Sequence, residues 1–420
     1  MCLPVFANSP WLFGYPQGAP LLDNWTLDID YSIFFRLVRL WRVQSGWVKI
    51  IMNVSAIFVE REFAAYDKVA EICDNLDAPA RVIDSLKEAY AYVNNGDDPV
   101  ARGKQTLILC RNKGAFFKSC PGTREYNCCG YEILHMASFC NMDCAYCILQ
   151  TYFHPPVMQY FINQGDMWSE LEQVIARKRI SRVGTGEFTD SLIWEGFSDL
   201  TQKLVQRFST QTRAVLELKT KTVAVDTLKG MDHNCKTILA WSLNTEKVIR
   251  SEERYTATLT ARLKAARRCA SWGYPIAFHF DPMVVYEGCE SDYRAVIEQL
   301  FAHVSPNNIV WISLGTFRYI PALKQIIQTR FPESGIVYNE FISGLDGKMR
   351  YFKPLRMNIY KKIVQWIREV APDVCIYFCM EDDEVWETCL GYAPSEKGGL
   401  AEMLDAAAIK HCGVTALTRS

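Results

Sequence analysis

The chain has 420 residues, of which 49% are hydrophobic and 22% are charged, with a formal net charge of -1 at pH 7. This composition is typical of a globular enzyme and excludes disorder as the main state, and the near-zero charge excludes a global attraction to nucleic acid. Residues 1–20 lack a secretory signal and no apolar run reaches the ~18 residues that span a bilayer, so the 16 cysteines indicate a thiol-rich cytoplasmic enzyme without a membrane span.

The first part of the chain divides into an extension and a small α/β unit. Residues 1–51 are rich in Trp and Pro, and the sequence assigns this N-terminal extension no role. An apolar strand follows Met52, and we take it as the start of a small α/β domain, residues 52–130. Within this domain the sequence predicts strands at residues 53–59 and 106–110 and helices near residues 64–76 and 83–93.

From residue 131 to residue 331, apolar strands alternate with segments of helix length. The strands are expected at residues 131–137, 182–186, 214–218, 237–242, 275–280 and 309–314, and the helices near residues 167–178, 197–208, 223–228, 258–272, 292–303 and 321–330. Such units imply a parallel sheet, and this spacing suits a partial (β/α)6 TIM-like barrel better than a flat doubly wound sheet. Residues 332–420 are expected to form a smaller C-terminal α/β extension.

Three closely spaced cysteines follow the first predicted barrel strand. Cys140, Cys144 and Cys147 lie in one short loop, so their thiolates can converge on one metal centre. Zinc normally takes a fourth protein ligand, and neither His135 nor His154 has a suitable spacing. Three ligands suit a [4Fe–4S] cluster with one iron open to an exogenous chelator. A structural zinc loop is the alternative.

The loop and the residues after it carry a resemblance. The three cysteines, with the aromatic Tyr146 before the last, resemble the radical S-adenosylmethionine superfamily, and Tyr-Cys-Ile-Leu-Gln-Thr at residues 146–151 is similar to the spore photoproduct lyase family. The similarity continues at lower density from about residue 56 to about residue 362. It implies a radical S-adenosylmethionine-type partial barrel, a cluster that binds S-adenosylmethionine, and an electron from a donor such as flavodoxin or ferredoxin. Cleavage would give a 5′-deoxyadenosyl radical that abstracts hydrogen from the substrate, and we include Tyr146 in the catalytic site.

Polar residues at the ends of the predicted strands form the expected cofactor site, because barrel enzymes place reactive groups there. Glu187 and Asp190 can take an ammonium group, and the resemblance implies that Glu187 contacts the methionine amine. It also implies that Lys221 contacts the methionine carboxylate. The full expected set comprises Glu187, Thr189, Asp190, Ser191, Lys221, Ser242 and Asn244 for the cofactor, and Arg318 and Tyr319 for the substrate. Sheet-end ion pairs and solvated rim residues are the alternative.

Two departures from the lyase pattern concern the hydrogen that completes its reaction. The family keeps a donor cysteine just after the second strand, whereas residues 187–192 contain none, and Ile148 replaces the tyrosine after the third cluster cysteine. Generating the radical needs neither residue, so the superfamily chemistry stands while the lyase assignment weakens. Cys289, after the fifth strand, is our candidate replacement donor. Two further sets of thiols, Cys110, Cys120, Cys128 and Cys129 before the cluster loop and Cys375, Cys379 and Cys389 in the C-terminal extension, are expected to be buried and inert, with an auxiliary cluster as the alternative.

Residues 348–362 combine six basic residues with aromatic ones and contain no acidic residue. Basic groups neutralise phosphates and aromatic faces stack on exposed bases, so this stretch is a candidate DNA contact through Arg350, Tyr351, Lys353 and Arg356. A solvated helix start is the alternative. Our first interpretation is thus a lyase-like radical enzyme that acts on a thymine photoproduct in DNA. The second is the same radical acting on another substrate, and the third is a zinc-binding nucleic-acid module.

Overall fold

The computed structural model describes residues 53–120, 122–123 and 125–415. The extension expected at residues 1–51 lies outside the described residues, while the residues that are described belong to one compact unit, Leu40–Ser420. No helix in the described part of the chain is long and apolar enough to cross a membrane.

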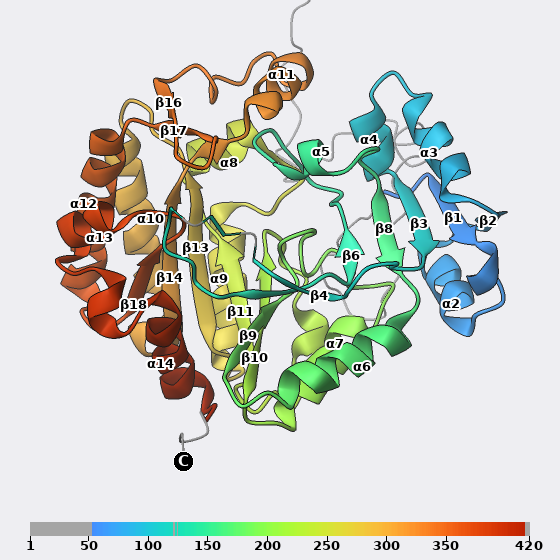
Figure 1. Cartoon of the computed structure of the whole chain (residues 1–420), viewed down its shortest axis with the longest axis horizontal. Coiled ribbons are helices and arrows are strands. Elements are labelled where there is room, and N and C mark those ends of the chain that lie inside the picture. The colour runs from blue at the N-terminus through green and yellow to red at the C-terminus, as the bar shows by residue number, and fades with distance from the viewer. Residues whose placement is uncertain (1–52, 121, 124, 416–420) are drawn as a thin grey trace, which may run out of the picture. The chain divides into compact units, whose positions relative to one another are not determined.

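A five-stranded sheet forms the N-terminal side of this unit, with the order β2-β1-β3-β8-β6 (Figure 1). Its strands are β1 (Ala56–Glu60), β2 (Ala80–Ile83), β3 (Thr106–Cys110), β8 (Met158–Phe161) and β6 (Ala137–Ser138), and its helices are α2 (Asp67–Leu76), α3 (Leu86–Asn94) and α4 (Pro99–Lys104). A capping box formed by Ser85 and Glu88 fixes the start of α3. The strands β6 and β8 come from the expected barrel segment, so a boundary at residue 131 does not separate two sheets.

An eight-stranded sheet carries the barrel, with the order β18-β14-β13-β11-β10-β9-β5-β4. Its strands are β4 (Phe117–Ser119), β5 (Glu132–Leu134), β9 (Ser181–Gly184), β10 (Ala214–Thr220), β11 (Thr237–Ser242), β13 (Ile276–Met283), β14 (Ile309–Thr316) and β18 (Cys375–Phe378). All neighbouring pairs are parallel except β4 with β5. Parallel strands are covered on both faces, which explains why β11 and β14 are buried along their whole length.

Helices and short elements complete the unit (Figure 1). The helices are α5 (Leu149–Tyr152), α6 (Gln164–Ile175), α7 (Leu200–Ser209), α8 (Glu246–Glu252), α9 (Leu259–Ser271), α10 (Cys289–His303), α11 (Pro321–Arg330), α12 (Lys353–Val370), α13 (Asp383–Leu390) and α14 (Leu400–Cys412). Two small sheets pair β7 (Asp143–Cys144) with β12 (Glu253–Arg254), and β15 (Arg318–Tyr319) and β16 (Phe341–Ser343) with β17 (Met349–Tyr351). Four 3-10 turns lie at Arg61–Phe63, Asp226–Leu228, Pro306–Asn308 and Pro394–Lys397.

The six predicted barrel strands are all present, as β5, β9, β10, β11, β13 and β14. The helix expected near residues 223–228 is wrong, because only the turn Asp226–Leu228 forms there. The boundary expected at residue 332 also fails to separate the sheets, since β18 pairs with β14 as a seventh parallel strand. The C-terminal segment thus completes one end of the barrel sheet.

Candidate active site at the carboxyl ends of the barrel strands

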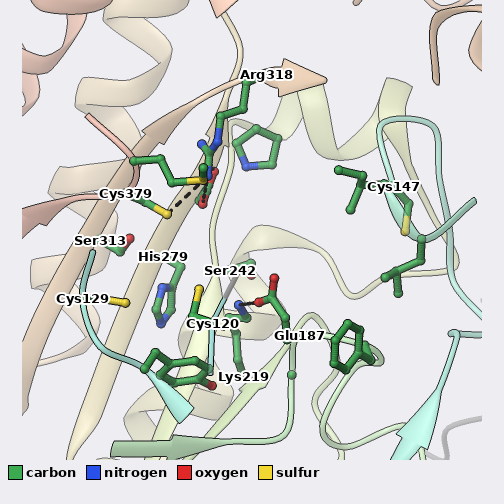
Figure 2. A pocket seen from close by; sticks show the side chains of 18 of the residues that line it. Cys120, Cys129, Cys147, Glu187, Lys219, Ser242, His279, Ser313, Arg318 and Cys379 are labelled. Atoms are coloured by element: carbon green, nitrogen blue, oxygen red, sulfur yellow. Dashed lines mark hydrogen bonds and ion pairs between the residues drawn. The ribbon is translucent and has the colours of Figure 1, made fainter. Parts of the chain in front are cut away.

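A cavity of about 540 Å³ opens where the barrel strands end (Figure 2). Residues from the ends of β9, β10, β11, β13, β14 and β18 line it, together with the three-cysteine loop. Of the residues expected from the sequence, Cys140, Cys144, Tyr146, Cys147, Glu187, Thr189, Asp190, Lys221, Ser242 and Arg318 line this cavity. Most of the residues expected from the cysteine loop and the strand ends therefore lie in one site.

The backbone of the cysteine loop is held by pairing with the segment at residues 252–254 and by the side chain of Gln150. The pairing of β7 with β12 anchors the middle of the loop, and the Ala145 N–H donates to the Glu252 carbonyl at 2.8 Å. The Gln150 side-chain amide donates to the carbonyls of Cys144, Ala145 and Cys147 at 3.4, 3.2 and 3.3 Å. The glutamine of the family-like sequence thus supports the backbone that presents the thiols.

Two buried cations attach this loop to neighbouring helices. Lys104, at the end of α4, donates to the Cys140 carbonyl at 3.2 Å and to the Met142 carbonyl, and its ammonium lies 4.5 Å from the centre of the Phe139 ring. Arg330, at the end of α11, contacts Asp143 at 3.0 Å. Because both side chains are largely buried, these contacts are shielded from solvent and fix the position of the loop.

The three thiols have the donor chemistry of a cluster site. All three are free cysteines on one wall of the cavity, and burial raises the pKa of the Cys140 thiol to about 12 and that of the Cys144 thiol still higher. Metal ligation requires thiolates, so each ligand bond formed here would release a proton. Within the described residues, no group of three His, Cys, Asp or Glu side chains is arranged to hold a single metal ion. Three thiolates without a fourth protein ligand are the donor set of a [4Fe–4S] cluster with one open iron, and this is the donor set that the loop presents to the cavity.

The residues expected to bind the cofactor fall into two groups, and the first group, Glu187, Thr189, Lys221 and Ser242, lines the cavity beside Lys219, which was not among the expected residues. Glu187 and Lys219 face each other across the cavity wall at 3.7 Å. Burial acts to lower the pKa of Lys219, but Glu187 and Glu217 outweigh it and raise this pKa. Together with Lys221 and Ser242 they present charged and hydroxyl groups to the cavity.

The second group serves the local structure instead. The Asp190 carboxylate accepts hydrogen bonds from the Leu192 and Lys221 N–H groups and from the Thr220 hydroxyl, at 3.0, 2.7 and 2.8 Å. Ser191 and Asn244 are buried and do not line the cavity. Ser191 accepts from the Lys219 N–H, and Asn244 donates to the Pro282 carbonyl. These three residues hold the strand ends in position.

Tyr146 lines the cavity but its hydroxyl is directed away into a buried charge network. The hydroxyl donates to Glu253, which also pairs with Arg262. Burial first, and then the Glu253 charge, raise the pKa of Tyr146 well above its ordinary value. The ammonium of Lys221 lies 5.8 Å from the Tyr146 ring centre. The ring therefore shapes the cavity, while the hydroxyl stays protonated.

A second charged wall lies at the ends of β13 and β14. Arg318 forms a forked ion pair with Asp281 at 3.1 and 3.2 Å and also donates to the Cys379 sulfur at 3.2 Å (Figure 2). Glu217, which lines the same cavity, lies 3.0 Å from His279 and accepts a hydrogen bond from the Trp311 ring N–H at 3.1 Å. Burial acts to raise the pKa of Glu217, but His279 outweighs it and holds this pKa below its ordinary value.

Two other sequence candidates lie outside the cavity lining. Cys289 is buried at the start of α10, and Tyr319 is buried against Phe317, with ring centres 5.3 Å apart. The prediction of Cys289 as a hydrogen donor therefore lacks the support of the cavity, because this buried residue is not part of its lining.

The basic stretch at residues 348–362 is not a solvated or DNA-facing surface at the four candidate positions. Arg350 and Tyr351 are buried, and Arg350 pairs with Asp346 at 2.7 Å. Arg356 forms a buried fork with Glu381 at 3.0 Å. Lys353 is half-buried and contacts Asp382 and Glu384 at 2.7 Å. Acidic partners just before the stretch, at Asp346, and further along the chain, at Glu381, Asp382 and Glu384, neutralise these basic groups, so the charge pattern gave a misleading signal.

Other cavity residues carried no distinctive sequence signal. They include Cys129, Tyr131, Lys219, Tyr377 and Cys379. Lys219 stands at a strand end and could have been found by that rule. The other four lie at the two ends of the barrel sheet, and only the sheet order brings them together.

Comparisons with known proteins identify the family of the chain. The family model of spore photoproduct lyase matches residues 56–377. The spore photoproduct lyase of Bacillus subtilis is 26% identical over 274 residues, covering 64% of this chain and 76% of its own, and that of a Geobacillus strain is 25% identical over 253 residues, covering 58% and 72%. Solved structures of spore photoproduct lyase share the fold, with TM-scores of 0.68 for a variant with bound AdoMet and dinucleoside spore photoproduct and 0.70 for another variant. Each is 21% identical and covers 78% of this chain and 99% of its own. With a family model that matches most of its length and a cysteine loop at the expected strand end, the chain belongs to the spore photoproduct lyase family.

Proposed function

We propose that this protein is a radical S-adenosylmethionine lyase that repairs a thymine photoproduct in DNA. The observation that carries the proposal is the position of Cys140, Cys144 and Cys147 on one wall of a cavity whose other walls present charged groups. When bound there, a [4Fe–4S] cluster supplies the electron that cleaves S-adenosylmethionine into methionine and a hydrogen-abstracting 5′-deoxyadenosyl radical. The electron itself would come from a protein reductant such as flavodoxin or ferredoxin.

The residues of the cavity have distinct roles in this proposal. Glu187 takes the methionine ammonium group, while Lys221 takes the carboxylate. Ser242 contacts the nucleoside part from the next strand end. Arg318, on the opposite side of the cavity, faces the substrate, for which a dinucleotide phosphate is a suitable partner (Figure 2). A base lesion within a duplex would have to be extruded to reach this cavity.

Anaerobic reconstitution with iron and sulfide tests the radical step without any substrate. We expect the reconstituted protein to hold close to one cluster per chain and to form 5′-deoxyadenosine with dithionite and S-adenosylmethionine. Replacing Cys140, Cys144 and Cys147 with alanine should abolish both, whereas Cys73→Ala, at a half-buried position on α2 outside the cavity, should abolish neither. Stoichiometric zinc without 5′-deoxyadenosine would contradict the proposal.

The substrate is tested in a second assay with dinucleoside spore photoproduct, the ligand named for one of the related solved structures. The proposal expects release of thymidylyl-thymidine that depends on reductant and S-adenosylmethionine. Formation of 5′-deoxyadenosine without this product would instead favour the same radical acting on another substrate. That outcome would keep the superfamily chemistry and discard the lesion.

A further inference from the structure

The two open ends of the barrel sheet meet at a wall of thiols and tyrosines. Cys129 and Tyr131 precede β5 at one end of the parallel strands, and Tyr377 and Cys379 end β18 at the other. All four line the cavity. Tyr377 and Cys379 are separated by one position at the end of β18, which places both on the same face of that strand. Figure 2 shows Cys129 and Cys379 on the side of the cavity away from Cys147.

The thiol of Cys379 is positioned from two directions. Its backbone N–H donates to the Leu314 carbonyl at 2.9 Å, which continues the pairing of β18 with β14. Its sulfur accepts a hydrogen bond from Arg318 at 3.2 Å, and Arg318 is itself fixed by the fork with Asp281. An accepted hydrogen bond leaves the S–H hydrogen available, and among the described residues we find no acceptor for it. By contrast, the Cys129 thiol is engaged with the thiols of Cys120 and Cys128.

The same wall contains a polar atom that lacks a partner. Within the described residues, the Tyr131 hydroxyl makes no hydrogen bond, whereas the Nε2 atom of His279 is paired with Glu217 at 3.0 Å. His279 is only 6% exposed and lines the cavity. Gly184 makes room for the Tyr131 hydroxyl, because a Cβ atom there would lie 1.3 Å from it. Buried polar groups without partners are costly, so this wall is suited to receive polar atoms of a ligand.

We propose that Cys379 is the hydrogen-atom donor that completes the reaction. The assignment rests on the proposed function, in which removal of a hydrogen atom leaves a carbon radical on the substrate and then on the product. The Cys379 S–H bond breaks and a product C–H bond forms, which leaves a thiyl radical on Cys379. One electron from the low-potential protein reductant and one proton from water restore the thiol. A thiol is suited to this step because an S–H bond is weaker than an aliphatic C–H bond.

Two further observations agree with this role. Burial raises the pKa of the Cys379 thiol to about 12, so the group remains an S–H donor at neutral pH rather than a thiolate. Residues 187–192 hold no cysteine, and Cys289 does not line the cavity, whereas Cys379 does. Cys379 comes from a different strand end but points into the same cavity.

Turnover in D2O tests the assignment. Thiol hydrogens exchange with solvent, so wild-type enzyme should return thymidylyl-thymidine carrying one deuterium from dinucleoside spore photoproduct. Cys379→Ala should lose most of this label and release less product, while still forming 5′-deoxyadenosine. Cys375→Ala is the matched control, because Cys375 lies on the same strand but does not line the cavity, and it should retain the label. Reconstituted Cys379→Ala, without reductant, should still bind the dinucleotide, because Arg318 keeps its fork with Asp281; loss of label with binding retained then assigns the defect to the chemical step.

The two proposals fail in different ways. Absence of 5′-deoxyadenosine from the wild-type enzyme contradicts the proposed function. If wild-type enzyme repairs the photoproduct, then an unchanged deuterium content and yield in Cys379→Ala overturn the assignment of Cys379. Loss of label in Cys129→Ala but not in Cys379→Ala overturns it as well and assigns the donor to the other side of the wall.

Discussion

Some buried charges in this protein close on each other, and others face the cavity. Glu253 with Arg262 and Glu381 with Arg356 are pairs in which both side chains are almost fully buried, and each pair satisfies its own hydrogen-bonding groups. Lys219, in contrast, meets Glu187 only at 3.7 Å across the cavity. Closed pairs contribute to structure, whereas a loosely paired charge in a cavity is able to bind a ligand. The sequence alone does not show whether a charged residue belongs to a closed buried pair or faces the cavity.

The closed pair of Arg356 and Glu381 gives the first prediction. Arg356→Met should lower the free energy of unfolding by about 3–5 kcal/mol, because it leaves a buried carboxylate without its cation. Lys361→Met, at an exposed position on the same helix, should change it by less than about 0.5 kcal/mol. Urea unfolding measures both. A loss of DNA affinity in Arg356→Met without a loss of stability would restore the DNA-contact role expected from the sequence.

The buried carboxyl of Glu195 predicts a pH-dependent stability. Burial raises its pKa to about 7, while hydrogen bonds from Gln202 and Thr227 reach one of its oxygens. The unfolded chain ionises this group at a lower pH, so the stability it contributes is complete below pH 4.5 and is lost as the pH rises through 7.

Comparison of Glu195→Gln with wild type between pH 5 and pH 8 measures this contribution. The wild-type protein should lose on the order of 2–3 kcal/mol relative to the variant over that range. Glu340→Gln, at an exposed position, serves as the surface control. Parallel curves for wild type and Glu195→Gln would show that the carboxyl does not change its charge in this range.

At the level of elements, the cysteine loop depends on segments from three parts of the chain. Lys104 ends α4, Gln150 lies in α5 and Arg330 ends α11, and all three contact the loop. Helix ends are rigid supports, since their side chains project from a hydrogen-bonded backbone. We therefore expect the geometry of the three thiols to weaken when any one support is lost.

Lys104→Met tests this dependence most directly. The substitution keeps an unbranched side chain but removes the donor for the carbonyls of Cys140 and Met142. A buried carbonyl without a donor costs ~1–3 kcal/mol, so iron loss to a chelator should accelerate roughly tenfold. Lys113→Met, at an exposed loop position, is the control and should lose iron at the wild-type rate. Equal rates in the two variants would show that the loop holds its shape without α4.

Local patterns predicted the barrel strands and the cysteine loop, but not the cavity wall formed by Cys129, Tyr131, Tyr377 and Cys379. The strands are apolar runs, and the cysteine spacing is a property of one short segment, so both can be read locally. That Cys375–Phe378 forms a barrel strand, by contrast, depends on pairing with β14, and the meeting of Cys129 with Cys379 depends on how the sheet curls. Likewise, Lys353 and Arg356 were misread because their acidic partners, Asp382 and Glu381, lie more than 20 residues away in the sequence.

At the scale of the described unit, the cysteine loop lies where its two large sheets meet. β6 precedes the loop and β8 follows it, and both belong to the N-terminal sheet, while the cavity in front of the loop is formed by the barrel sheet. A ligand that contacts the loop and the barrel ends therefore joins both sheets. Its binding energy should appear as stability of the whole unit, because a ligand that binds only the folded state shifts the unfolding equilibrium.

Thermal unfolding under anaerobic conditions measures this coupling. At 100 times its Kd, S-adenosylmethionine should stabilise the reconstituted protein by about 2.7 kcal/mol and raise its Tm as the concentration increases. In Glu187→Gln the rise in Tm should require a higher concentration of S-adenosylmethionine, because the methionine ammonium group loses the carboxylate proposed to bind it. The variant with alanine at Cys140, Cys144 and Cys147 should show no ligand-dependent shift, since the cofactor then has no cluster to chelate. A shift of wild-type size in that variant would mean that S-adenosylmethionine binds elsewhere, and the assignment of the cavity walls would have to be abandoned.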